Sequence, residues 1–156
     1  MKISQVSSIP NLTHNVECMI PRLFQRARET GKRTVKPEHI LLELGGQNHG
    51  FGGAILIDHL RKLGIKVTEL KEKLFGNIPT TKKPAPEITF GKDTIKIFED
   101  ASKLTEGTIG GGELLLAIAK RFGNIGKIKE LKLDPDLIEK ELKERNPRIP
   151  YWKRLI

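Results

Sequence analysis

The chain has 156 residues, with 28 Lys and Arg against 19 Asp and Glu, and so carries a net charge of +9. Its single cysteine, Cys18, excludes an intramolecular disulfide, and its 37% hydrophobic and 30% charged residues exclude a disordered chain. No apolar run approaches the roughly 20 residues that span a bilayer, and residues 1–6 lack the apolar stretch of a secretory signal. We therefore expect a cytoplasmic globular protein.

The first helix is predicted after Thr13, a good N-cap, and ends at Gly31. Pro21 falls inside it and is expected to kink or interrupt it, because proline removes a backbone donor. The apolar positions that share one helical face are Val16, Met19, Ile20, Leu23 and Ala27.

Three further helices are predicted before residue 76, and no strand. One begins at Pro37 and closes at Gly45 and Gly46. A glycine-rich loop, Gly45 to Gly53, leads to the next helix, which Gly64 ends. The apolar residues of the third and fourth helices are Ile55, Leu56, Leu60 and Leu63, then Val67, Leu70 and Leu74.

The second half of the chain repeats this plan. The apolar spacing of residues 60–74 recurs 68 positions later, Ile40 to Leu42 recur as Leu114 to Leu116, and Leu12-Thr13 recurs as Ile88-Thr89. We therefore predict an all-α fold of two pseudo-symmetric four-helix repeats, eight helices in all. The expected segments are an N-terminal extension (1–11), the first repeat (12–75), a Pro-rich linker (76–87), the second repeat (88–145) and a C-terminal tail (146–156).

These residues resemble the amino-terminal domain of the Clp-type AAA+ unfoldases. In that family each repeat opens with an apolar residue followed by Thr, and the next helix begins Gly-Thr-Glu-His-Ile-Leu-Leu-Gly-Leu. Residues 36–44 keep the Glu-His-Ile-Leu-Leu core and depart from it at Lys36, Pro37 and Glu43. In the second copy, Gly112 stands at the Glu position.

The resemblance implies a non-catalytic recognition module that docks substrates, adaptors or a Clp-type unfoldase and so modulates protein degradation or remodelling. The 156 residues hold no Gly-x-x-x-x-Gly-Lys-Ser/Thr loop for nucleotide phosphates, so we expect a free-standing domain that needs no cofactor. Some family members bind phosphorylated arginine. By position, the resemblance places Glu38 and Thr13 in such a site in the first repeat and leaves only Thr89 in the second.

Other chemistry is weakly indicated. Glu38 also favours a helix start, and His39 is expected to hydrogen-bond between helices. His14 and Cys18 lie four residues apart and could chelate a metal, but no third ligand is evident, and Cys18 is expected to pack as a small hydrophobe. We therefore predict neither a metal site nor an enzyme.

Two basic regions leave alternatives open. One cluster is opposed only by Glu29, and it is either a solvated face, a dock for an acidic partner or a nucleic-acid surface. Binding of nucleic acid is thus the alternative function, although only 5% of the residues are aromatic. The tail holds the only Tyr and Trp, Tyr151 and Trp152, as candidate anchors that either fold back or insert into a partner. The basic cluster comprises Arg22, Arg26, Arg28, Lys32, Arg33 and Lys36.

Overall fold

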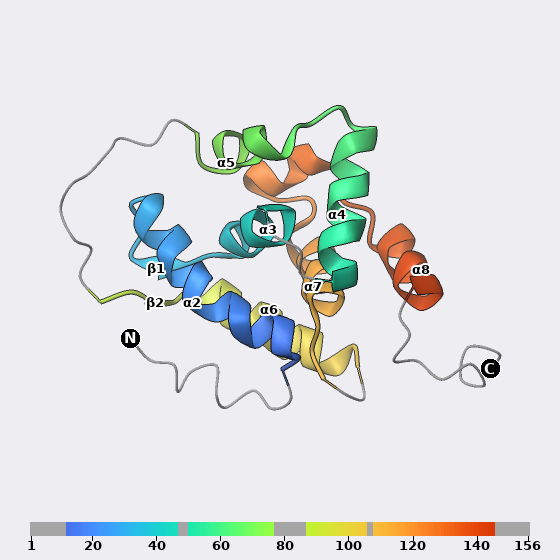
Figure 1. Ribbon diagram of the computed structural model, residues 1–156, viewed down its shortest axis with the longest axis horizontal. Helices are drawn as coiled ribbons and strands as arrows, with labels where there is room; N and C mark the ends of the chain where they lie inside the picture. The colour runs from blue at the N-terminus through green and yellow to red at the C-terminus, as the bar shows by residue number, and fades with distance from the viewer. Residues whose placement is uncertain (1–11, 47–49, 77–86, 106–107, 146–156) are drawn as a thin grey trace.

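The structure is a computed structural model that describes residues 12–46, 50–76, 87–105 and 108–145 (Figure 1). These residues form seven α-helices and one 3₁₀ helix, which confirms the predicted eight helices. The first half contains α2 (His14–Glu29), β1 (Thr34–Val35), α3 (Pro37–Gly46), α4 (Gly50–Lys62) and α5 (Val67–Phe75). The second half contains β2 (Thr89–Phe90), α6 (Lys92–Lys103), α7 (Gly111–Phe122), η1 (Gly126–Leu131) and α8 (Pro135–Arg145).

The helices α3 and α7 lie in the middle of the fold (Figure 1). Helices α2, α4 and α5 pack around α3, while α4, α6 and α8 pack around α7. Every residue from Gly111 to Ala119 is buried, so α7 is covered on all sides. An edge-to-face chain of aromatic rings, Phe24 to Phe90 (5.0 Å) and Phe90 to Phe98 (6.0 Å), ties α2 and α6 together through β2.

The predicted ends of the first helix are confirmed. The Thr13 hydroxyl accepts a hydrogen bond from the Val16 amide at 3.3 Å, and α2 ends before Gly31, whose φ of +69° suits glycine. Pro21, however, does not interrupt the helix, which is assigned without a break from His14 to Glu29. The apolar face of α2 is buried on both sides of this proline, and tertiary packing of that face outweighs the loss of one backbone hydrogen bond.

Two expectations for the first half need correction. The chain is not entirely helical, because β1 and β2 pair as a parallel two-stranded sheet, with Thr34 opposite Thr89 and Val35 opposite Phe90. Strands of two residues are too short for alternation to be visible in a sequence. The loop expected from Gly45 to Gly53 is also shorter than predicted, because Gly50 to Gly53 form the first turn of α4.

The helices α4 and α7 cross at glycines. A β-carbon added to Gly52 would lie 2.3 Å from the carbonyl carbon of Gly111, a distance that real side chains do not reach. A β-carbon on Gly112 would meet the Leu142 side chain of α8 at 2.2 Å. The first half therefore packs on α7 with backbone against backbone, and Leu142 of α8 covers the adjacent residue, Gly112, of the same helix.

Within the described residues, no helix combines the length and the apolar character that crossing a membrane would need.

We predict that Gly52→Ala destabilises the protein although alanine is the better helix former. Relief of the clash with Gly111 requires α4 and α7 to separate, and over-packing of this kind costs about 1–3 kcal/mol. The measurement is urea unfolding followed by circular dichroism. Ala54→Leu, which adds more atoms at an exposed position of the same helix, is the control and should change stability by less than about 0.5 kcal/mol. A Gly52→Ala protein as stable as the parent would contradict the proposed crossing.

Candidate functional site

The start of α3 is organised around a buried histidine, as predicted for His39. Its Nδ1 accepts a hydrogen bond from the Lys36 amide at 2.8 Å, so Nε2 carries the proton and donates to the Thr30 hydroxyl at 2.7 Å. That hydroxyl in turn donates to the carbonyls of Arg26 (2.9 Å) and Ala27 (3.1 Å) at the end of α2. The imidazole also stacks on Phe75 of α5, with 4.6 Å between ring centroids. His39 thus holds three helices together.

The start of α7 uses the same geometry with a different residue. Glu113 stands 74 positions after His39, and its carboxylate accepts a hydrogen bond from the Gly110 amide at 3.2 Å, as His39 does from Lys36. In each repeat, the third residue of the central helix therefore caps the amide that precedes the helix. The histidine and the glutamate are both buried.

The resemblance places Thr13 near Glu38, but in the structure Thr89 is the threonine that lies near the start of α3. Thr89 lies on β2 beside Thr34, and the Thr89 amide donates to the Arg33 carbonyl at 3.2 Å. The strand β1 ends two residues before α3, the helix that carries Glu38. Thr13 instead donates its amide to the Ile109 carbonyl at 3.0 Å, immediately before α7. Each repeat's opening segment thus pairs with the other repeat, which brings Thr89, and not Thr13, to the approach to α3.

Glu38 itself is partly exposed in the first turn of α3. Within the described part of the chain, no hydrogen bond or ion pair engages its carboxylate. At the corresponding place in α7, Gly112 is buried and offers no side chain. The α3 end of the fold therefore presents a carboxylate that the α7 end lacks.

Two arginines of the basic cluster face a buried carboxylate, that of Glu43, and the sequence analysis did not predict this contact. Glu43 is only 1% exposed on α3, and it accepts from the Arg26 Nε at 3.0 Å and faces Arg22 at 3.6 Å. Arg26 also lies 3.8 Å from Glu29. The only available signal was the presence of Glu where the family has Gly. Two of the six cations thus hold α2 against α3.

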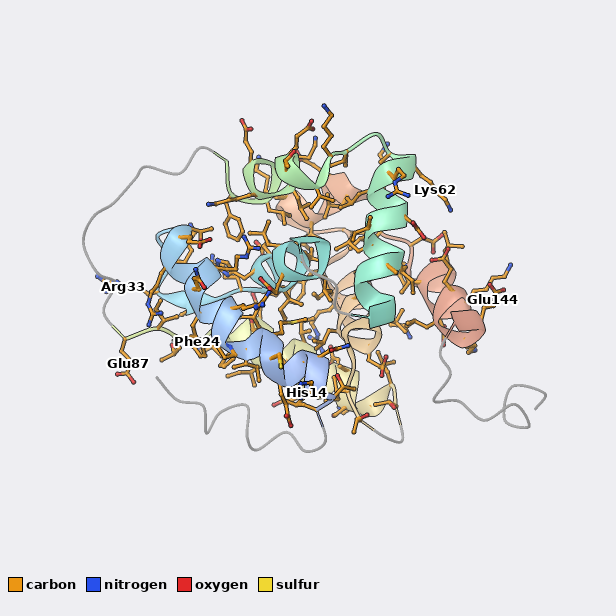
Figure 2. The ribbon with its side chains drawn as sticks, viewed as in Figure 1. His14, Phe24, Arg33, Lys62, Glu87 and Glu144 are labelled. Carbon is orange, nitrogen blue, oxygen red and sulfur yellow. The ribbon has the colours of Figure 1, made fainter. Side chains whose placement is uncertain are left out.

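The other members of the basic cluster lie around the turn between α2 and α3. Arg28, Arg33 and Lys36 are exposed, and Lys32 is half-buried. Figure 2 labels Arg33. Lys36 and Lys32 are close enough to His39 to disfavour its charged form. Together with burial, which is the larger cause, they lower the pKa of His39 to about 3.

Cys18 does not pack into the core as expected but is exposed on α2. The pattern that predicted the buried face placed Cys18 between Val16 and Met19 in sequence, yet two residues after Val16 the helix has turned by about 200°. The Cys18 Sγ lies 3.5 Å from the His14 Nε2. No group of three or more candidate metal ligands occurs among the described residues. Tyr151 and Trp152 lie outside the described residues.

The sequence comparison defines the family. Residues 11–130 match the Clp repeat (R) N-terminal domain, and the chain therefore belongs to this family. No curated protein sequence matches the chain significantly.

Solved structures share the fold at low sequence identity. The N-terminal domain of Hsp104 from Candida albicans aligns with a TM-score of 0.64 and 16% identity over 87% of this chain and 92% of that one. The N-domain of ClpV from Vibrio cholerae aligns with a TM-score of 0.60 and 16% identity over 94% and 84%. A ClpV N-domain in complex with a VipB peptide aligns with a TM-score of 0.58 and 16% identity over 94% and 86%. At these identities the likeness establishes the fold alone.

We predict that His39 makes the protein less stable in acid. Its pKa is about 3 when folded and near 6.5 when unfolded, so between these values the unfolded chain binds the extra proton. Stability therefore rises with pH through this window and levels off above pH 7. Between pH 7 and pH 4 the loss is roughly 3 kcal/mol. Urea unfolding across this range should show that loss in the parent but not in His39→Gln, once their shared acid sensitivity is subtracted. Parallel curves would contradict the assignment.

We also predict that Arg26 contributes far more to stability than Arg22. Arg26→Met removes the 3.0 Å partner of the buried Glu43 carboxylate but leaves Arg22 at 3.6 Å, so we expect a loss near the lower end of the roughly 3–5 kcal/mol that breaking a buried pair costs. Arg22, which is 50% exposed, should cost less than about 1 kcal/mol when replaced by Met. Chemical denaturation of the two variants makes the comparison. Equal, small losses would show that the Arg26–Glu43 pair does not hold α2 on α3.

Proposed function

We propose that this domain is a non-catalytic recognition module that binds a segment of a partner protein, either a substrate, an adaptor or a Clp-type unfoldase. The supporting observation is its membership of the Clp repeat (R) N-terminal domain family, together with its fold likeness to a ClpV N-domain that was solved with a VipB peptide. Through such binding the domain would modulate protein degradation or remodelling.

We place the contact with the partner at the approach to α3. The Glu38 carboxylate there forms no hydrogen bond or ion pair with another described residue. A carboxylate can accept two hydrogen bonds from the planar guanidinium of an arginine. The exposed cations Arg33 and Lys36 flank the same segment and would accept an acidic or phosphorylated group. The hydroxyl of Thr89 lies on the neighbouring strand. An arginine, with or without a phosphate, is therefore the side chain we expect this site to prefer.

The remaining candidate residues contribute less to this proposal. Thr13 uses its hydroxyl to cap α2, and the segment it adjoins has a buried glycine in place of Glu38. We therefore propose one site, at the α3 end, rather than two symmetric sites. Pro37 at the start of α3 removes one amide donor from the site, and the lysine and arginine side chains supply the positive charge instead.

Binding of nucleic acid is the weaker candidate. Arg26 and Arg22 are committed to Glu43, and Arg121 forms a two-pronged contact with Asp100 at 2.6 and 3.1 Å. Charge committed in this way is less available to neutralise phosphates. Four members of the basic cluster remain for an anionic partner of either kind, namely Arg28, Lys32, Arg33 and Lys36.

We predict that the domain binds arginine-containing peptides in a way that depends on Glu38. Fluorescence anisotropy with a library of labelled peptides, carrying arginine, phosphoarginine or glutamine at one position, is the measurement. Glu38→Gln should weaken binding of the arginine peptides by roughly 10- to 150-fold, which corresponds to the roughly 1.5–3 kcal/mol of a charge-assisted hydrogen bond.

Glu130→Gln removes an exposed carboxylate from η1 and is the matched control, with no expected effect on affinity. The peptides and labelled DNA and RNA are all measured at a low and a high salt concentration. Tight, steeply salt-dependent binding of nucleic acid with no peptide binding would refute the proposed function in favour of the alternative.

A further inference from the structure

A shallow groove lies between α4 and α8. These two helices lie at the opposite end of the molecule from β1 (Figure 1). Its floor is apolar and contains Ile55 of α4, Leu115 of α7 and Ile138 of α8. Figure 2 labels Lys62 on α4 and Glu144 on α8, the two helices that flank it. The groove does not include the α3 site of the proposed function and is independent of it.

The rim of the groove exposes an apolar side chain next to a carboxylate. Leu137 of α8 is 41% exposed, although the neighbouring Ile138 is 5% exposed. Glu141 follows one turn later on the same face and forms no hydrogen bond or ion pair with another described residue. His59, on the opposite wall, is held by the Leu131 carbonyl at 2.7 Å. Lys62 of α4 also lines the groove, but no described cation forms an ion pair with Glu141.

We propose that this α4–α8 groove is the docking site of the chain's own segment 146–156, with Trp152 against Leu137. This segment follows α8 directly and carries Ile149, Tyr151, Trp152, Leu155 and Ile156, which are apolar or aromatic. Its charged residues are Arg148, Lys153 and Arg154, all cationic, which complements the carboxylate of Glu141, for which no described residue provides a partner.

The connection is long enough for this docking. Leu137 lies eight residues before the end of α8, roughly 12 Å back along the helix axis. Six residues, the number from Asn146 to Tyr151, span up to roughly 20 Å when fully extended. A tether this short gives an effective concentration on the order of millimolar, so even a weak contact is populated.

Trp152 is the only tryptophan of the chain, so its fluorescence reports this segment alone. In the 156-residue chain we expect Trp152 to emit at a shorter wavelength than in a synthetic peptide of residues 146–156. We also expect acrylamide to quench this fluorescence about twofold less than in the peptide, because half-occupancy of the groove shields Trp152 in half of the molecules. Leu137→Glu should return both values to those of the peptide. Glu141→Lys should do so partly, and it keeps the apolar contacts in case Leu137→Glu impairs folding.

Ile125→Glu changes another exposed apolar residue, 56% exposed and outside the groove, and should leave the fluorescence unchanged. Quenching equal to that of the peptide would overturn the proposal. So would protection that survives both groove variants, since the segment would then dock elsewhere. Protection that disappears on dilution would also overturn it and would assign the segment to a second copy of the chain.

Discussion

The close crossing of α4 and α7 is the constraint on which the rest of the fold depends. Because Gly52 meets Gly111 with backbone against backbone, the first half can approach the second more closely than side chains would allow. This approach buries α7 on all sides and lets α8 cover Gly112 with Leu142. The same packing leaves α4 and α8 as the two walls of a groove, so the interface between the halves also shapes a surface.

The central helices of the two halves are capped at their N-termini by different side chains. His39 caps the Lys36 amide at the start of α3, and Glu113 caps the Gly110 amide at the start of α7. A histidine in this position also reaches Thr30 and Phe75, because its second ring nitrogen donates a hydrogen bond, whereas an ionised carboxylate only accepts. The α3 end, which His39 ties to α2 and α5, is where we propose that the partner binds.

Charge in this protein serves stability and, in the function that we propose, recognition. Glu43 engages two arginines inside the structure, which lowers the density of free cations on α2 and keeps α2 on α3. Arg33 and Lys36 stay exposed and lie within five residues of Glu38 in the sequence, so the proposed site presents both signs of charge. A mixed surface of this kind suits a peptide with a cationic side chain and an anionic group better than a uniform polyanion.

Much of the fold and part of the site could be predicted from the sequence. Local signals identified the helices, the cap at Thr13, the end of α2 before Gly31, and the Glu38-His39 pair, because helix periodicity, capping and motif residues act over a few positions. Only the tertiary structure decided that Thr89 approaches α3 while Thr13 approaches α7, that Glu43 is buried against Arg26, and that Gly52 belongs to a helix crossing. These features depend on contacts between residues far apart in the chain, and a local pattern carries no information about which distant backbone or charge it will meet.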